Sequence, residues 1–186
     1  MMRILRGRLK NKKLPIHDRW VRPTSAYRRE LIFNRIEHAG LFTDFSKANV
    51  VDVFAGTGAL GLEALSRGAQ SLTLIEKSLK THEKLKHFLN IHNLENTVRL
   101  LNADACSLPQ HPPHLKRFNL CFLDAPYNQN LIPGALDSLR HQGWLDENAI
   151  LIMELDKKES CPLPPWLKTE NERLKGRTRV LFLKTS

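Results

Sequence analysis

From residue 49 to residue 155, short apolar segments alternate with stretches in which apolar residues recur at helical spacing. The apolar segments predict strands at 49–54, 71–75, 98–101, 119–123 and 149–155. The stretches between them predict helices at 60–67, 78–91 and 131–141. Strands and helices that alternate at this spacing form a parallel sheet, because each connection returns the chain to the same edge by a right-handed crossover. The fold class is therefore α/β.

The two ends of the chain depart from this alternation. Thr24 or Ser25 can cap a helix that continues until Gly40 stops it. At the other end, segments 166–174 and 177–184 flank a Lys-Gly turn and predict an antiparallel hairpin.

The net charge of +10 is concentrated at the two ends. Residues 1–30 carry ten Lys and Arg against two acidic residues, and residues 165–186 carry six against two. Basic ends on a nearly neutral central region are expected of a protein that binds a polyanion at its periphery. The alternative is a solvated basic tail without a partner. We predict a basic N-terminal arm at 1–23 and, from the length of 186 residues, a single domain at 24–186.

Composition argues against several classes of protein. The longest apolar runs are strand-sized and no apolar segment follows the basic N-terminus, so we expect no membrane partner. The three cysteines form no CxxC pair and the eight histidines form no ligand set, so we expect no metal site. These features predict a cytoplasmic protein, and we expect a monomer.

A G-x-G-x-x-G motif at Gly56, Gly58 and Gly61 lies between a predicted strand and a predicted helix. Glu76 closes the next strand, 20 residues after Gly56. Glycines at such a junction let the backbone turn tightly and approach a ligand, and an acid in this position accepts hydrogen bonds from ribose hydroxyls. The motif predicts a nucleotide-type ligand; alternatively, the glycines serve only the turn.

Two further acids distinguish between possible ligands. Asp52 lies just before the glycine turn, where it would repel a pyrophosphate but attract the cationic S-adenosylmethionine (SAM). Alternatively, Asp52 only accepts hydrogen bonds from the backbone of the loop. Asp104 follows the third strand and can accept a hydrogen bond from an adenine amino group, or it is a simple turn residue. The residues expected around SAM are Asp52, Phe54, Ala55, Gly56, Gly58, Gly61, Glu76, Lys77, Asp104 and Ala105.

The fourth predicted strand ends in the tetrapeptide Asp124-Ala125-Pro126-Tyr127, at the edge where open α/β sheets carry out chemistry. Asp124 and the carbonyl of Ala125 can each accept a hydrogen bond from an exocyclic amine, while Tyr127 offers a flat face to a base. Two acceptors on one amine direct its lone pair out of the ring plane, so positioning of the amine would supply most of the rate enhancement. We predict that the tetrapeptide is catalytic in methyl transfer to a base amine; the alternative is a surface turn.

Several segments resemble the RsmD family, bacterial SAM-dependent methyltransferases that act on guanine N2 of small-subunit (16S) ribosomal RNA. The sequence VDVFAGTGALGLEALSRGA at 51–69 looks like the SAM loop of that family. Arg-Pro-Thr at 22–24 and Arg-Glu at 29–30 are similar to its N-terminal signature, and 3–15 resembles its basic arm. Gly-Trp-Leu at 143–145 fits as well, so the similarity covers nearly the whole chain.

The resemblance implies a Rossmann-like class I methyltransferase fold, with a mostly parallel seven-stranded sheet and helices on both faces. It also implies SAM as cofactor and N2-methylation of one guanine in 16S ribosomal RNA, presented in a partly or fully assembled small subunit. The residues that would contact RNA are Arg3, Arg6, Arg8, Lys10, Lys12, Lys13, Arg22, Thr24 and Arg29.

The sequence departs from the family pattern at a few positions. Ala125 stands where the family has proline, which leads us to expect slower chemistry, because the carbonyl acceptor is kept but a rigid ring is lost. Ala26 and Tyr27 replace an Asp-Arg pair, and Arg6 and Asn11 stand where glycines are usual. These departures weaken the case for assigning the family's RNA-contact roles to this chain more than the case for assigning its SAM-binding roles.

Other functions are compatible with parts of the pattern. A DNA adenine-N6 or cytosine-N4 methyltransferase would use the same tetrapeptide, although such enzymes usually carry a target-reading region. An RNA-binding ribosome-assembly factor, weakened in catalysis by Ala125, would account for the basic ends of the chain. An NAD oxidoreductase would account only for the glycine motif.

Overall fold

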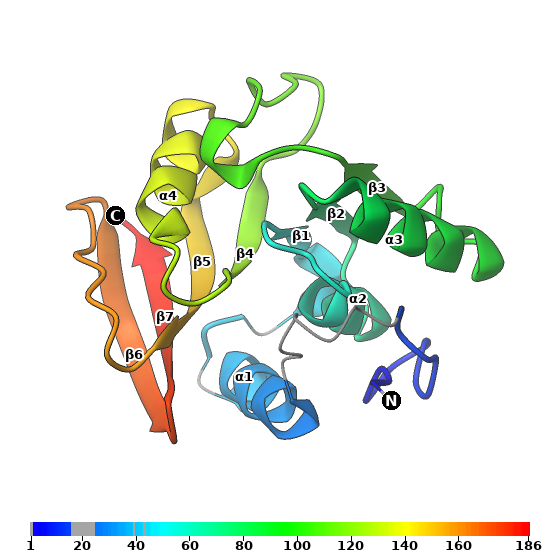
Figure 1. Ribbon diagram of the computed structural model, residues 1–186, viewed down its shortest axis with the longest axis horizontal. Coiled ribbons are helices and arrows are strands. Elements are labelled where there is room, and N and C mark those ends of the chain that lie inside the picture. Colours follow the sequence, from blue (N-terminus) through cyan, green and yellow to red (C-terminus); the bar gives the residue numbers. More distant parts are fainter. Residues whose placement is uncertain (1, 16–24, 39, 43) are drawn as a thin grey trace.

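The computed structural model describes residues 2–15, 25–38, 40–42 and 44–186 (Figure 1). Its strands are β1 (Asn49–Asp52), β2 (Ser71–Ile75), β3 (Val98–Leu101), β4 (Phe118–Asp124), β5 (Leu145–Asp156), β6 (Leu167–Lys175) and β7 (Thr178–Thr185). Its helices are α1 (Ala26–His38), α2 (Ala59–Ser66), α3 (Leu79–Ile91) and α4 (Leu131–His141), with short 3-10 turns η1 (Phe45–Lys47) and η2 (Ala105–Ser107). The predicted strands and helices of the described residues are all present, with β5 beginning four residues before the predicted start.

The seven strands form one sheet in the order β3-β2-β1-β4-β5-β7-β6. Strands β1 to β5 are parallel, whereas β7 runs antiparallel to both β5 and β6. The structure therefore confirms the predicted mostly parallel sheet with a C-terminal antiparallel hairpin. The strand order reverses between β1 and β4, which is the point where sheets of this kind bind ligands beyond the carboxyl ends of their strands.

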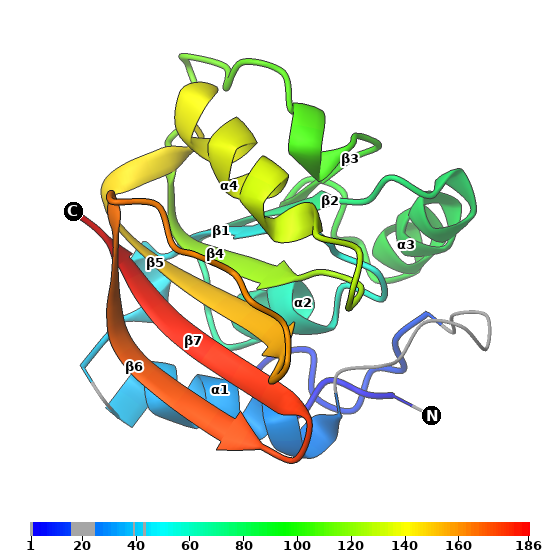
Figure 2. The ribbon, with the colours of Figure 1, turned by 60° about the vertical axis from the view of Figure 1, so that its left-hand side comes forward.

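Helices cover both faces of the sheet, as predicted (Figure 2). Because side chains alternate along a strand, Leu120 and Phe122 of β4 join the core beneath α1, α2 and α3. Cys121 and Leu123 of the same strand join the core beneath α4 and η2. Of the helices in the described part of the chain, none is long and apolar enough to cross a membrane.

The described part of the predicted arm, residues 2–15, is packed onto the domain. Ile4, Leu9 and Leu14 are buried in the same core as α1 and α2. Gly7 has a φ of +80°, and a Cβ there would lie 1.7 Å from the carbonyl oxygen of Ser66 on α2, so the segment approaches the helix as closely as glycine allows. We call residues 2–15 the docked segment. The predicted boundary at residue 23 lies outside the described residues, as do Arg22 and Thr24.

Candidate active site

A cleft of about 810 Å³ opens beyond the carboxyl ends of the parallel strands. Its walls come from the glycine loop after β1, the residues after β2 and β3, and the tetrapeptide after β4. Arg28 of α1 and Glu154 of β5 complete its lining. The cleft therefore lies at the strand-order reversal and holds both predicted motifs together.

The glycines of the motif have different roles. Gly56 lines the cleft with a φ of +53°, and its N–H donates to Glu76 Oε2 at 2.9 Å. Gly58 begins α2 in a left-handed conformation, where a Cβ would lie 2.9 Å from Leu62. A Cβ on Gly61 would lie 2.8 Å from side chains of β2. Gly58 and Gly61 do not line the cleft itself; they serve the turn and the packing of α2 on the sheet, and their predicted place around the cofactor stays a prediction.

Asp52 occupies the buried end of the cleft. Its side chain is 2% exposed, and its Oδ2 accepts a hydrogen bond from the N–H of Gly61 at 2.9 Å. Burial raises the pKa of Asp52 to about 7, although this hydrogen bond opposes the shift and the charge of Glu76 adds to it. The bond to the loop backbone matches the alternative role considered for Asp52, and the carboxyl group still lines the cleft.

Glu76 and Asp104 hold the loops after β2 and β3 in place. Glu76 accepts hydrogen bonds from the N–H of Gly56 and, at 2.7 Å, from the N–H of Ser78. Asp104 caps η2 by accepting from Cys106 N–H at 3.0 Å and pairs with Lys77 at 2.6 Å. The hydrogen bond from Lys77 is the largest influence that lowers the pKa of Asp104. Each carboxylate oxygen retains a second lone pair for a ligand.

The tetrapeptide lines the cleft from the end of β4, the strand that pairs with β1. Asp124 ends β4 beside Glu154 in the sheet register, Ala125 is buried and Pro126 is exposed. The hydroxyl of Tyr127 donates to Glu154 Oε1 at 2.6 Å and lies 3.2 Å from Thr178 Oγ1. Burial, followed by the hydrogen bond to Glu154, raises the pKa of Tyr127 to about 12, so its phenol is neutral at physiological pH.

Sequence reasoning did not select Arg28 and Glu154 as site residues. Arg28 pairs with Glu154 and also donates to Tyr127 Oη at 3.3 Å, so the ring of Tyr127 is fixed from α1 and β5 together. The sequence did contain a pattern that could have identified Glu154: it is an acidic residue near the carboxyl end of a predicted strand, as Glu76 is. For Arg28 the local pattern gave no signal, since its position depends on how α1 packs against β5 and β7.

The remaining cofactor residues, Phe54, Ala55, Lys77 and Ala105, line the cleft together with Asp52, Gly56, Glu76 and Asp104. The predicted roles of these side chains in binding stay predictions. Among the described residues, no group of three or more His, Cys, Asp or Glu side chains is arranged to hold a metal ion.

The predicted RNA contacts separate into two groups. The exposed ones on the docked segment are Arg3, Arg6, Arg8, Lys10, Lys12 and Lys13. Arg29 is a correction: its side chain is 1% exposed, faces Glu63 at 3.6 Å and donates to the carbonyl of Arg3 at 2.9 Å. Burial lowers the pKa of Arg29, and a guanidinium enclosed in this way cannot reach RNA.

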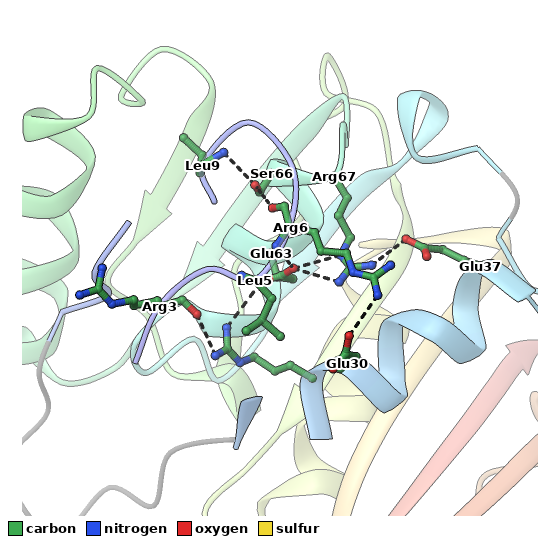
Figure 3. Close-up of polar contacts among 10 residues, drawn as sticks. Arg3, Leu5, Arg6, Leu9, Glu30, Glu37, Glu63, Ser66 and Arg67 are labelled. Carbon is green, nitrogen blue, oxygen red and sulfur yellow. Dashed lines mark hydrogen bonds and ion pairs between the residues drawn. The ribbon is translucent and has the colours of Figure 1, made fainter. Parts of the chain in front are cut away.

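Glu63 organises the docked segment from α2 (Figure 3). Its fully buried carboxylate accepts from the N–H of Leu5 at 2.7 Å and from the N–H of Arg6 at 3.0 Å. The same carboxylate pairs with Arg67 at 3.0 Å, and Ser66 bonds to the backbone of the segment on the next turn of α2. Arg29 and Glu63 thus hold the segment that carries the exposed cations.

Comparisons with known proteins agree with this architecture. The family model described as "Conserved hypothetical protein 95" matches residues 2–184. "Ribosomal RNA small subunit methyltransferase D" of Escherichia coli K12 is 34% identical over 168 residues, which cover 88% of this chain and 79% of the relative. The protein of the same name from Buchnera aphidicola (subsp. Baizongia pistaciae) is 31% identical over 178 residues, covering 94% and 87%.

Solved structures of bacterial proteins share the fold over almost its full length. A putative methyltransferase from Escherichia coli has a TM-score of 0.82 at 28% identity, with 99% of this chain and 97% of that chain covered. A putative methylase from Haemophilus influenzae has a TM-score of 0.80 at 27% identity, with 98% and 97% covered. The chain therefore belongs to the Conserved hypothetical protein 95 (RsmD) family of SAM-dependent methyltransferases.

Proposed function

We propose that the protein transfers the methyl group of SAM to the exocyclic N2 amine of a guanine in small-subunit (16S) ribosomal RNA. The observation that carries the proposal is that the glycine loop and the Asp124–Tyr127 tetrapeptide line one cleft. A cofactor held by the first would therefore face an amine held by the second. The relatives at 34% and 31% identity bear the name of small-subunit ribosomal RNA methyltransferases, which supports the choice of RNA.

The charges that line the cleft fit a cationic cofactor without phosphate. Five acidic residues line the cleft against three cationic ones, and Lys77 is paired with Asp104 and Arg28 with Glu154. The acids are Asp52, Glu76, Asp104, Asp124 and Glu154, and the third cation is Lys80. In this arrangement Gly56 would bring the backbone close to the cofactor, Glu76 would hold its ribose and Asp104 its adenine. Asp52 would lie nearest the cationic end. When bound, SAM supplies an electrophilic methyl group on a sulfonium.

The tetrapeptide would hold and orient the base. Asp124 and the carbonyl oxygen of Ala125 would accept the two hydrogens of the guanine amine, so that its lone pair is turned toward the cofactor. Tyr127 would stack on the base, with its hydroxyl anchored to Glu154. Asp124 needs little basicity, because the amine becomes strongly acidic as it is methylated and its proton leaves afterwards. Ala125 supplies its acceptor from the backbone, so the loss of proline there would keep the acceptor and slow the reaction rather than abolish it.

The docked segment would supply affinity for the RNA. Its six exposed cations are held on α2 through Glu63 and Ser66, so they form a fixed basic surface rather than a loose tail. Phosphate contacts of this kind position a nucleic acid without reading its sequence. The target guanine would accordingly be selected at the cleft and by the shape of the assembled subunit.

The decisive experiment is transfer of labelled methyl groups from SAM to small subunits and to deproteinised 16S RNA, both from cells that lack the protein. Nucleoside mass spectrometry of the product should show N2-methylguanosine and no other new methylated nucleoside. Methylated adenine or cytosine in a DNA substrate, with unmodified RNA, would overturn the assignment. RNA binding without any transferred label would instead indicate an assembly factor.

A further inference from the structure

The turn between β6 and β7 lies at the same edge of the sheet as the reacting groups. Asp124 at the end of β4 is beside Glu154 of β5, and Asp156 at the end of β5 is beside Thr178, which begins β7. Neighbouring strands are about 4.8 Å apart, so β7 lies about 10 Å from β4. The hairpin turn therefore reaches the region beside the cleft, where Figure 2 shows it next to the start of α1.

The first turn of α1 connects this hairpin to the cleft. Arg28 lines the cleft and donates to Thr178 Oγ1 at 3.3 Å. The preceding residue, Tyr27, is 56% exposed. The buried residues of α1 are Arg29, Ile32, Phe33 and Ile36. Packing of α1 on the sheet thus makes little use of the ring of Tyr27.

Tyr27 is instead paired with a cation from the hairpin. The ammonium nitrogen of Lys175 lies 4.9 Å from the centroid of the Tyr27 ring, within the range of a cation–π interaction. Leu174, the neighbour of Lys175 on β6, is 65% exposed. The hairpin segment 168–179 carries five Lys and Arg against two Glu. An exposed aromatic ring, an ammonium group and a net positive strand pair therefore lie together beside the cleft.

These groups have the chemistry of a site for single-stranded RNA. Aromatic side chains stack on unpaired bases, and neighbouring cations hold the backbone phosphates. A guanine that enters the cleft must leave its own stack, which exposes the face of the adjacent base. A ring outside the cleft can cover that face and offset part of the unstacking free energy.

We propose that Tyr27 and Lys175 form a stacking platform for a nucleotide adjacent to the target guanine, whose base would stack on the face of the Tyr27 ring away from Lys175 and whose phosphate would lie near Lys175. This inference rests on the proposed RNA substrate and adds a second contact surface, separate from the docked segment. It places the path of the RNA strand across α1 and the β6–β7 turn.

Two measurements on Tyr27→Ala test the platform. The dissociation constant for fluorescently labelled 16S RNA, measured by anisotropy, should rise by the loss of one stacked base, about 5- to 150-fold. The KM for small subunits should rise by a similar factor, while kcat at saturating subunits and the KM for SAM should change less than about twofold. Tyr27→Phe should retain near-normal values, because it keeps the stacking face.

Matched variants separate the platform from general surface effects. Lys175→Ala should weaken RNA binding and lower the slope of log affinity against log salt by about one, whereas Lys168→Ala, at the opposite end of β6, should not. Ile91→Ala removes a comparably exposed side chain, 60% exposed at the end of α3, and should have no effect. If Tyr27→Ala binds RNA with wild-type affinity, the platform is refuted even if methylation proceeds. If wild-type enzyme methylates no RNA while Tyr27→Ala still weakens binding, the proposed reaction fails, and Tyr27 is an RNA contact that does not serve a target guanine.

Discussion

Replacing Glu63 by glutamine would remove the carboxylate that joins the docked segment to α2. That carboxylate faces Arg29, whose side chain is 1% exposed, and pairs with Arg67, whose side chain is 4% exposed. Arg67 keeps Glu37 at 2.8 Å, but Arg29 would be left with the carbonyl of Arg3 as its polar contact from the segment. The glutamine amide could also accept from one of the two backbone N–H groups that Glu63 now satisfies, while its NH2 would face the other.

The size of the expected loss of stability follows from the burial of this ion pair. Breaking a buried ion pair by neutralising one member destabilises a protein by about 3–5 kcal/mol, because the other charge stays buried without compensation. For a chain of this length each kcal/mol corresponds to about 2–4 °C in Tm. We therefore expect Glu63→Gln to lower Tm by about 6–20 °C.

Thermal unfolding followed by circular dichroism measures the shift, with limited proteolysis as a second readout of residues 2–15. Glu30→Gln is the matched control, because Glu30 pairs with Arg6 on the surface, where the side chains are 49% and 51% exposed. Such exposed pairs contribute about 0–1 kcal/mol, so the control should shift Tm by less than about 4 °C. A Glu63→Gln protein with the Tm of the control and an unchanged rate of cleavage in the docked segment would refute the reasoning.

Other variants test the cleft and the RNA surface. Because the folded-state pKa of Asp52 is raised to about 7, the native state binds more protons than the unfolded state between about pH 4 and 7, so the stability contributed by this group falls as pH rises through that window. Urea unfolding should therefore show wild type losing about 3 kcal/mol relative to Asp52→Asn between pH 5 and pH 8, and parallel pH profiles would disprove this. Asp124→Ala should lower kcat for methyl transfer by about 10²–10³-fold and leave SAM affinity, measured by calorimetry, nearly unchanged; near-normal turnover would exclude Asp124 as an amine acceptor. Charge reversal of Lys12 and Lys13 together should weaken RNA binding and reduce its salt slope by about two, whereas reversal of the exposed Lys47 on η1 should leave the slope as it is.

The local part of the fold could be predicted because each strand and helix has its own periodicity. The segment 120–123 is apolar without interruption, as expected of a central strand buried on both faces, and β4 spans it. The glycine motif likewise predicted its turn, since Gly56 and Gly58 both have positive φ. Patterns of this kind depend only on residues that are close in sequence, so they can be recognised before the fold is known.

Tertiary packing decided the residues for which the sequence interpretation failed. Arg29 and Arg28 are adjacent basic residues in one helix, yet one is buried beside Glu63 and the other lines the cleft. Their difference depends on which side of α1 meets α2 and which meets β5, and the local pattern of the helix does not reveal it. Tertiary packing also gives Gly61 of the nucleotide-binding motif a role that the motif alone does not reveal, the close approach of α2 to β2.

The attachment of the docked segment to α2 also has a consequence for the order of folding. The N–H groups of Leu5, Arg6 and Leu9 find their acceptors 57 or 58 residues later in the chain. At translation rates of about 5–20 residues per second, those acceptors emerge from the ribosome about 3–12 s after their donors. Throughout that interval the six cations are held by no helix, and the nascent chain must build α2 before residues 2–15 can take their final place.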